Sequence, residues 1–251
     1  MKKRPFVVVL ASLVAALVIG GIFMASVVAE RGSYNPAQQG PEPATSVENA
    51  PEPRFARGTQ VVRMERFAIK PVDWQERNTA EFDDKNGAWA TQTGKLAQTG
   101  TALGDTGFDE TMSLAPVNTD GSVTISTQVY PQGNQVVGLV FRASDAGYYL
   151  FRVFRGGEAK LPVRYQIQRY DAETGLYTIL AEDRTSAGYD LGRWQELRVQ
   201  LDGDQITGSF DGKQVLTATD ATYTNGDAGV YTVALGDVFF DNFAVVRPQG
   251  Q

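Results

Sequence analysis

The 251-residue chain contains no cysteine and no histidine. Without cysteine it cannot form a disulfide, a zinc–thiolate site, an iron–sulfur cluster or a thiol nucleophile. Without histidine it cannot use a Ser-His-Asp triad, an imidazole general base or a histidine-ligated metal. Any chemistry would therefore use carboxylates, lysine, arginine, tyrosine, serine or threonine.

An excess of positive charge is also lacking. The 29 acidic side chains outnumber the 23 basic ones, which gives a net charge of −6 and a pI near 4.8. Nucleic-acid binding needs a basic face that neutralises phosphates, so the composition predicts no nucleic-acid partner. The lack of cysteine is compatible with export, because a domain of this size builds its own core without disulfides.

The N-terminus combines a basic start with a long apolar run. Lys2, Lys3 and Arg4 precede the segment Phe6–Ala29, which has no charged residue. As a helix with a rise of about 1.5 Å per residue, this segment would reach roughly 36 Å, enough to cross a hydrocarbon core of about 30 Å. The basic residues predict a cytoplasmic N-terminus and an extracytoplasmic remainder. Residues 1–29 are therefore interpreted as the signal anchor of a single-pass membrane protein, with one transmembrane helix.

The alternative for residues 1–29 is a cleaved signal peptide. Val27-Val28-Ala29 has the small residue that cleavage requires, and cleavage there would make the protein a secreted one. Signal-peptide cores usually span about 7–15 residues, so the length of the apolar run favours the anchor. Both interpretations place the remainder of the chain outside the cytoplasm.

Residues 30–58 have the composition of a spacer. They are rich in Pro, Gln, Ser, Glu and Ala and contain almost no large apolar side chains. Such a segment cannot bury enough surface to offset its ordering entropy, and its prolines favour an extended conformation. The sequence predicts a disordered linker here, followed by a folded domain over residues 59–248.

The folded domain has an all-β pattern. Short runs rich in Val, Ile, Tyr, Phe and Thr recur at intervals of about ten residues, separated by Gly, Asp and Asn. Asp202-Gly203 and Asp211-Gly212 indicate tight hairpins, because glycine accepts a positive φ. A sandwich of two antiparallel sheets, a jelly roll, fits this pattern. The expected strands are Ser122–Tyr130, Gln135–Arg142, Gly147–Phe154, Val163–Tyr170, Tyr177–Ala181, Trp194–Leu201, Gln205–Phe210, Gln214–Ala218, Ala228–Ala234 and Val238–Val246.

Four segments of the domain follow one another in the order of a known family. They are Glu81–Gln98, with a Trp and a Gly-Lys-Leu turn; Gly138–Val153, a strand pair; Gly192–Asp220, with a Trp and two hairpins; and Gly226–Val246, with Phe-Asp-Asn. In this order they resemble the concanavalin A-like lectin/glucanase superfamily. Laminin G-like and levan-binding-type carbohydrate modules are the most similar members, together with the related 3-keto-disaccharide hydrolase domain. The resemblance implies a concanavalin A-like jelly roll.

Catalysis is less well supported than binding. Glucanases of this superfamily carry a Glu-x-Asp-x-(x)-Glu pattern on one strand, and retaining hydrolysis needs two carboxyls about 5–5.5 Å apart. The pattern is absent from this sequence. We therefore predict a non-catalytic carbohydrate-binding domain. The alternatives are a glycoside-acting hydrolase of the 3-keto-disaccharide type and a structural protein-interaction module of the cell envelope.

Candidate binding residues recur on neighbouring expected strands. Sugars are held by aromatic faces and by polar groups with several donors or acceptors. Because side chains alternate along a strand, residues of one parity share a face. The candidates for a shallow groove that binds carbohydrate or a cell-surface glycan are Arg142, Tyr148, Arg152, Arg164, Gln166 and Gln168. A solvated outer sheet face is the alternative interpretation of the same residues.

The resemblance also implies a structural calcium ion. Sandwiches of this superfamily often hold Ca²⁺ between the first and last strands through carboxylate and backbone oxygens. Asp241 matches the ligand on the last strand, and Asp83 or Glu81 would supply the ligand on the first. The alternative for Asp241 is a carboxylate that accepts hydrogen bonds from neighbouring backbone amides. No other cofactor is expected.

Overall fold

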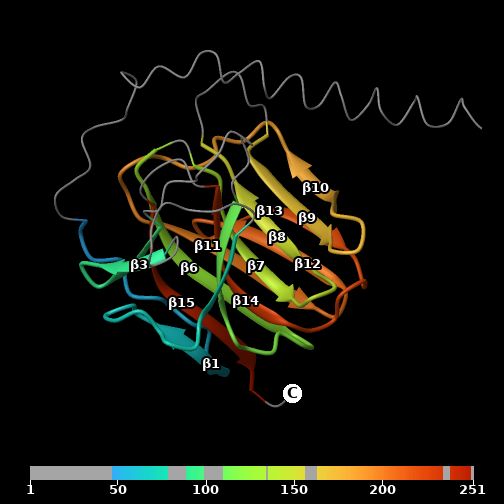
Figure 1. Cartoon of the computed structure of the whole chain (residues 1–251), viewed down its shortest axis with the longest axis horizontal. Helices are drawn as coiled ribbons and strands as arrows, with labels where there is room; N and C mark the ends of the chain where they lie inside the picture. The colour runs from blue at the N-terminus through green and yellow to red at the C-terminus, as the bar shows by residue number, and fades with distance from the viewer. Residues whose placement is uncertain are drawn as a thin grey trace, which may run out of the picture. The chain divides into compact units, whose positions relative to one another are not determined.

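The computed structural model describes residues 47–78, 89–98, 110–133, 135–155, 163–233 and 238–249 (Figure 1). Within these ranges the chain forms fifteen strands in two antiparallel sheets and no helix. A helix long and apolar enough to cross a membrane is accordingly absent from the part of the chain that the structure describes. The predicted anchor, residues 1–29, and residues 30–46 of the predicted linker lie outside the described residues.

One sheet has eight strands. Its order is β13 (Lys213–Thr219), β12 (Gln205–Phe210), β11 (Gln195–Asp202), β6 (Val123–Pro131), β15 (Val238–Pro248), β4 (Lys95–Gln98) and β3 (Trp89–Gln92), with β1 (Thr59–Glu65) also paired to β15. β15 is the longest of these strands. It pairs with β6 on one side, and on the other side with β4 at its beginning and β1 at its end.

The other sheet has seven strands. Its order is β10 (Leu176–Asp183), β9 (Tyr165–Asp171), β8 (Gly147–Val153), β7 (Val137–Ala143), β14 (Asp227–Val233), β5 (Glu110–Ala115) and β2 (Gln75–Asn78). Figure 1 shows this sheet lying over the eight-stranded one. The described domain is therefore a two-sheet jelly-roll sandwich, as the sequence predicts.

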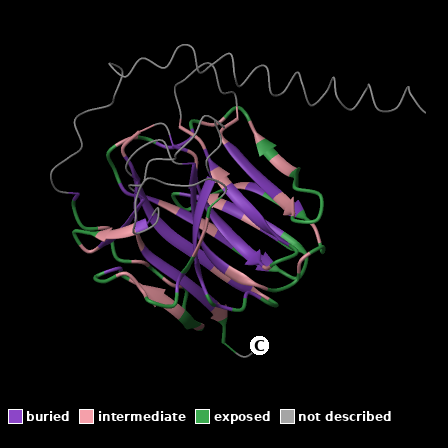
Figure 2. Cartoon of the chain, in the orientation of Figure 1, coloured by how far each residue is buried: buried purple, intermediate pink, exposed green. Residues whose placement is uncertain are grey.

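The core between the sheets follows from alternation along the strands. On β11, Leu197, Val199 and Leu201 are fully buried, whereas the residues between them are half-buried or exposed. Phe141 and Phe151 fill the same core from the seven-stranded sheet. β7 and β8 differ from β11 because they are buried on both faces (Figure 2). The outer face of the seven-stranded sheet therefore carries a second packed layer.

The strand and hairpin predictions are confirmed. Each of the ten expected strands is present within two residues of its expected bounds. Gly203 and Gly212 have φ angles of 60° and 74° in the turns of the two predicted hairpins, which is why glycine occupies both positions. The sequence pattern missed β1, β2 and β5. β2 has only four residues, too few for a recognisable alternation.

Residues 47–58 of the predicted linker lie against the outer face of the eight-stranded sheet. Val47 is buried there in a cluster with Tyr130 and Trp194. The Trp194 indole Nε1 donates to the Glu48 carbonyl at 2.9 Å, and the Asn242 side-chain amide donates to the Pro51 carbonyl at 2.9 Å. The segment is thus held by the Val47 side chain and by two backbone carbonyls, and its composition does not reveal the carbonyl contacts. The folded domain begins before Thr59.

Candidate functional site

The second packed layer lies on the outer face of the seven-stranded sheet. Val140, Leu150 and Tyr231 are all buried in a cluster separate from the main core. They alternate along their strands with core residues, so they point away from the sandwich interior. Polar and aromatic side chains extend the same layer over β8 and β9, and they are Tyr148, Arg152, Gln166, Gln168 and Tyr170.

A glycine makes room in the middle of this face. Gly138 on β7 lies beside Arg152 on β8 and Tyr231 on β14. A Cβ atom at Gly138 would lie 2.4 Å from the Phe151 carbonyl oxygen and 3.3 Å from the Tyr231 ring. In its absence the Arg152 guanidinium lies 5.5 Å from the centre of the Tyr231 ring, within the range of a cation–π contact.

A carboxylate links the two sides of this face. Glu110 on β5 accepts hydrogen bonds from the hydroxyls of Tyr231, at 2.7 Å, and of Tyr177 on β10. The Tyr177 and Tyr148 hydroxyls lie 2.8 Å apart. Burial and the charge of Glu110 raise the pKa of all three tyrosines. At neutral pH they are therefore uncharged phenols that donate or accept hydrogen bonds.

A row of polar side chains crosses β8, β9 and β10 on the same face. Arg152 Nη1 donates to Gln168 Oε1 at 2.9 Å, and Gln168 Nε2 donates to Gln166 Oε1 at 2.8 Å. Gln166 Nε2 lies 3.5 Å from Glu182 Oε2. The structure thus brings four of the six sequence-predicted binding residues to one face, since Tyr148 lies on it too.

A pocket of about 340 Å³ opens at one end of this face. Its lining residues are Arg77, Asn78, Met112, Ser144, Asp145, Gly147, Tyr148, Tyr170 and Ala172. The Tyr148 and Tyr170 rings stack with their centres 4.7 Å apart. Arg77 donates to the Ser144 carbonyl at 2.9 Å and pairs with the exposed Asp145 at 3.7 Å. Aromatic carbon, a guanidinium and a carboxylate therefore border the same hollow.

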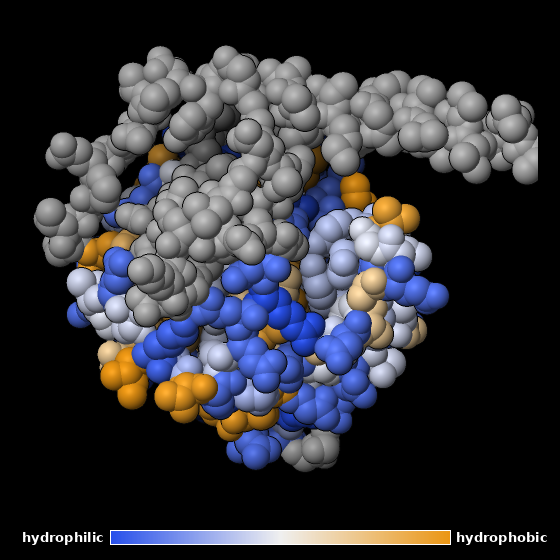
Figure 3. Space-filling model, viewed as in Figure 1, coloured by the Kyte–Doolittle hydropathy of each residue, from blue (hydrophilic) through white to orange (hydrophobic). Residues whose placement is uncertain are grey.

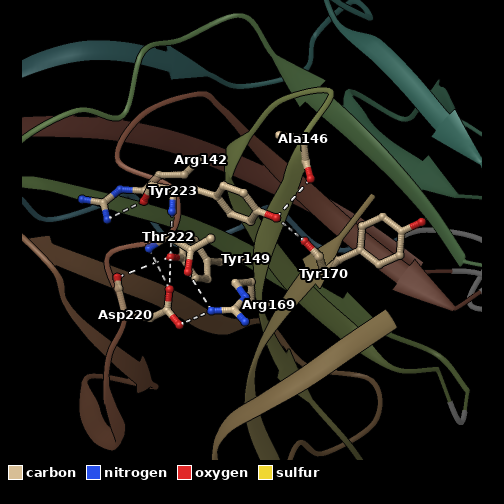
Figure 4. A network of polar contacts seen from close by, with 8 residues as sticks. All are labelled: Arg142, Ala146, Tyr149, Arg169, Tyr170, Asp220, Thr222 and Tyr223. Atoms are coloured by element: carbon tan, nitrogen blue, oxygen red, sulfur yellow. Dashed lines mark hydrogen bonds and ion pairs between the residues drawn. The ribbon is translucent and has the colours of Figure 1, made fainter. Parts of the chain in front are cut away.

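Arg142 lies elsewhere. Its side chain is buried, and its guanidinium donates to the carbonyls of Gly203, at 2.7 Å, and Tyr223, at 3.1 Å (Figure 4). Gly203 lies in the turn between β11 and β12 of the eight-stranded sheet, so Arg142 ties the seven-stranded sheet to this hairpin. Burial lowers the pKa of Arg142. The structure does not bring it together with the other predicted binding residues.

Figure 4 shows the polar network to which Arg142 belongs. The Asp220 carboxylate accepts hydrogen bonds from the Tyr149 hydroxyl, at 2.6 Å, and from Arg169 Nη1, at 2.6 Å. The Tyr223 hydroxyl donates to the carbonyls of Ala146 and Tyr170. Burial alone would raise the pKa of Asp220, but the bonds that it accepts lower it. This network fastens the 220–223 turn to β8 and β9.

Two further predicted residues, Arg164 and Asp241, do not line the pocket. Arg164 precedes β9 and donates to the Val163 carbonyl at 3.2 Å. Asp241 on β15 accepts a hydrogen bond from the Asn242 amide at 2.7 Å, and burial raises its pKa. Asp83 and Glu81 lie outside the described residues. Among the residues that the structure does describe, no three carboxylates cluster as a metal site, so the calcium ion stays a prediction.

Sequence reasoning missed Arg77, Glu110 and Tyr231. Arg77 and Glu110 belong to β2 and β5, which the pattern did not predict. The sequence could have predicted Tyr231. Alternation along the expected strand Ala228–Ala234 places the Tyr231 side chain on the outer face, because Val230 faces the core.

No family model matches the chain, and no curated protein matches its sequence. Solved structures do resemble it. The carbohydrate-binding module CBM66 from Bacillus subtilis has a TM-score of 0.52 at 20% identity, over 69% of this chain and 94% of that one. A Bacillus subtilis protein of unknown function with a galectin-like fold has a TM-score of 0.54 at 14% identity, over 74% and 94%.

A β-1,3-glucanase from Mycobacterium marinum has a TM-score of 0.50 at 11% identity, over 74% of this chain and 98% of that one. Binding modules and glucanases thus share this architecture. Sequence identities of 11–20% show a common fold and do not show a common function. The protein has the concanavalin A-like lectin/glucanase fold that its sequence resemblance implies.

Proposed function

We propose that this protein is a membrane-anchored, extracytoplasmic protein whose β-sandwich binds carbohydrate without cleaving it. The observation that carries the proposal is the pocket at the stacked rings of Tyr148 and Tyr170, bordered by Arg77 and Asp145. The basic N-terminus and the apolar segment Phe6–Ala29 support the anchor.

The pocket suits a saccharide on chemical grounds. The C–H face of a sugar ring packs on an aromatic face, and the half-buried Tyr170 ring lines the pocket. A guanidinium donates several hydrogen bonds to adjacent hydroxyl oxygens, and a carboxylate accepts several from adjacent hydroxyl groups. The volume of about 340 Å³ lies at the low end of small-molecule sites, which run from about 300 to 1,000 Å³. A short segment of a saccharide is the ligand that fits.

The experiment is a glycan array followed by affinity measurements on the full chain in detergent. Tyr170→Ala removes one ring of the stack, and we expect at least a tenfold weaker binding, about 1.4 kcal/mol. Tyr170→Phe keeps the ring and should bind nearly as well as the wild type. Leu176→Ala on the exposed edge of β10 is the control. Unchanged binding by Tyr170→Ala, or no binding to any glycan, contradicts the proposal.

A glycoside hydrolase is the second candidate, because Glu110 and Glu182 lie on the same outer face. Hydrolysis needs one carboxyl that acts as an acid and another that acts as a nucleophile or base. Here Glu110 is held by two tyrosine hydroxyls, and Glu182 by Arg184 at 2.8 Å, an arrangement that favours structural roles. Release of reducing ends by the wild type, abolished in Glu110→Gln, would establish the hydrolase and displace the binding proposal.

The anchor has its own test. Membranes from cells that express the full chain are washed with alkaline carbonate, which removes peripheral proteins. We expect the chain to stay in the membrane fraction and its β-sandwich to be digested by protease added from the outside. Recovery of the chain in the soluble fraction would contradict the anchor and leave the glycan proposal standing.

A further inference from the structure

The loop between β1 and β2, residues 66–74, presents aliphatic side chains to water. Ile69 is 80% exposed and Val72 is fully exposed. Single apolar residues on a surface are ordinary, but these two share one short loop with Ala68, which is also exposed. Figure 3 shows hydrophobic surface at the lower left of the domain, where Figure 1 draws β1 and the chain that follows it.

Both ends of the loop are fixed in the domain. Phe67 and Trp74 are buried, and their rings pack edge to face at 5.2 Å. Trp74 also packs edge to face against Phe243 of β15 at 5.0 Å. Arg63 on β1 donates to both carboxylate oxygens of Asp73, at 2.8 and 2.9 Å. These contacts fix both ends of the loop, and Ile69 and Val72 are exposed between them.

The charged group in the middle of the loop turns away from its tip. Lys70 Nζ donates to the Trp89 carbonyl at 2.8 Å and to the Glu76 carboxylate. The lysine charge is therefore paired with Glu76 and is not presented at the tip of the loop. The tip that remains consists of Ala68, Ile69, Pro71 and Val72.

The segment that leads in from the N-terminus runs beside this loop. Glu52 pairs with Arg66, the first residue of the loop, at 2.8 Å. Pro51 is held by Asn242 on β15 at 2.9 Å. Residues 30–46 separate the predicted membrane segment from Val47, and fully extended they reach at most roughly 60 Å. A membrane that holds the anchor is thus within reach of the domain.

We infer that the 66–74 loop is a second membrane contact, which inserts Ile69 and Val72 into the bilayer surface. The inference rests on the proposed anchor. Two aliphatic side chains bind lipid weakly by themselves, but a tether raises their effective concentration at the bilayer to the order of millimolar. The contact would set the orientation of the β-sandwich relative to the membrane.

The lack of cysteine makes the test direct, because one introduced cysteine is the only labelling site. Ile69→Cys in the full chain is labelled with the fluorophore NBD and reconstituted into vesicles of phosphatidylcholine and phosphatidylglycerol. We expect a blue shift of the NBD emission and quenching by doxyl-labelled lipids. Leu176→Cys, at a position 65% exposed on β10, is the control and should show neither. Adding Val72→Asp to Ile69→Cys should reduce both signals.

Flotation of the same vesicles separates the two proposals. If the chain floats with the vesicles but the label at residue 69 emits as in water, the loop contact is wrong and the anchor stands. If the chain does not float, the anchor is wrong and the loop contact falls with it. Quenching at residue 176 as strong as at residue 69 would indicate non-specific adsorption and would also overturn the inference.

Discussion

Consecutive residues on β8 and β9 build two clusters of the same chemistry on opposite faces of one sheet. Tyr148 and Tyr170 point outward and line the pocket. Tyr149 and Arg169, their immediate neighbours in sequence, point to the other face and bind Asp220. The inner cluster is Tyr149, Arg169 and Asp220. The outer cluster is Tyr148 and Tyr170 with Arg77 and Asp145, so both clusters combine tyrosine, arginine and aspartate. Their surroundings differ because side chains alternate along a strand.

The difference lies in whether the cluster is enclosed within the chain or borders the pocket. The Tyr149 hydroxyl donates to Asp220 and accepts from the Tyr223 amide at 3.0 Å, so both of its roles are used within the chain. The outer cluster, in contrast, lines the pocket. The inner cluster holds the 220–223 turn to the sheet, whereas a ligand in the pocket can reach the outer cluster. This contrast predicts that substitutions of the inner cluster reduce stability and those of the outer cluster reduce binding.

The largest effect is expected for Asp220→Ala. The substitution removes the acceptor of Tyr149 and Arg169, and leaves an arginine without its carboxylate. We expect the free energy of unfolding to fall by about 2–4 kcal/mol, measured by chemical denaturation. Asp145→Ala is the control at the pocket, where the carboxylate is fully exposed, and should leave the free energy of unfolding close to that of the wild type. Equal losses would contradict the contrast.

Alkaline pH should act on the inner cluster as well. Burial raises the pKa of Tyr149 to about 12, above its value of about 10 in the unfolded chain. The stability linked to this shift is complete below pH 10 and is lost as the pH rises through 12, at most about 2–3 kcal/mol. Tyr149→Phe should flatten the decline, measured as denaturation midpoints from pH 8 to 12. A residual slope is expected from Tyr165, whose pKa burial also raises to about 12. The outer-face tyrosines Tyr148, Tyr177 and Tyr231 add to it, because burial raises their pKa as well.

Arg142 and Arg152 are both binding candidates in the sequence, but their substitution by alanine should affect stability and glycan binding differently. Arg142→Ala removes the donors to Gly203 and Tyr223, and we expect about 1–3 kcal/mol less stability with unchanged glycan affinity of the folded protein. Arg152→Ala removes a half-buried donor to Gln168 on the outer face, beside Tyr148 but outside the lining of the pocket. It should weaken glycan binding modestly, by loosening the face on which the pocket lies, with a smaller effect on stability. Affinity titrations and denaturation curves of both variants decide this. Lost affinity in a stable Arg142→Ala protein would reverse the assignment.

Arg142 also shows where prediction from sequence ends. Strands and hairpins followed from local patterns, because alternation and Asp-Gly turns act over a few residues. The face of the sheet on which Arg142 lies could not be predicted from such patterns, because β7 is irregular there. The pairing of β7 with β14 shifts register between Asp227 and Gly229, and Arg142 has a φ of 50°. Its partner Gly203 lies 61 residues away, a separation that no local pattern encodes.

The outer face was predictable in part for the same reason. Gln166 and Gln168 share a parity and a strand, so sequence alone placed them together. Glu110 bonds to Tyr177 from five strands away in the order of the sheet, and only the assembled sheet brings the two together. The segment 47–58 was assigned to the linker because it contributes only one large buried apolar side chain, Val47, and because its contacts with Trp194 and Asn242 use backbone carbonyls, which composition does not register.

The smallest effect, and the most closely matched comparison, comes from removing one hydroxyl from each of two adjacent residues. Tyr149→Phe deletes a donor to a charged carboxylate and an acceptor of an amide, so we expect about 1–2 kcal/mol less stability. Tyr148→Phe deletes one contact with Tyr177, which still donates to Glu110, and should lose at most about 0.5 kcal/mol. Both variants keep their rings, so packing is unchanged and the difference reports the hydrogen bonds. Denaturation at pH 7 measures it, and losses of equal size would show that the two faces of the sheet are satisfied alike.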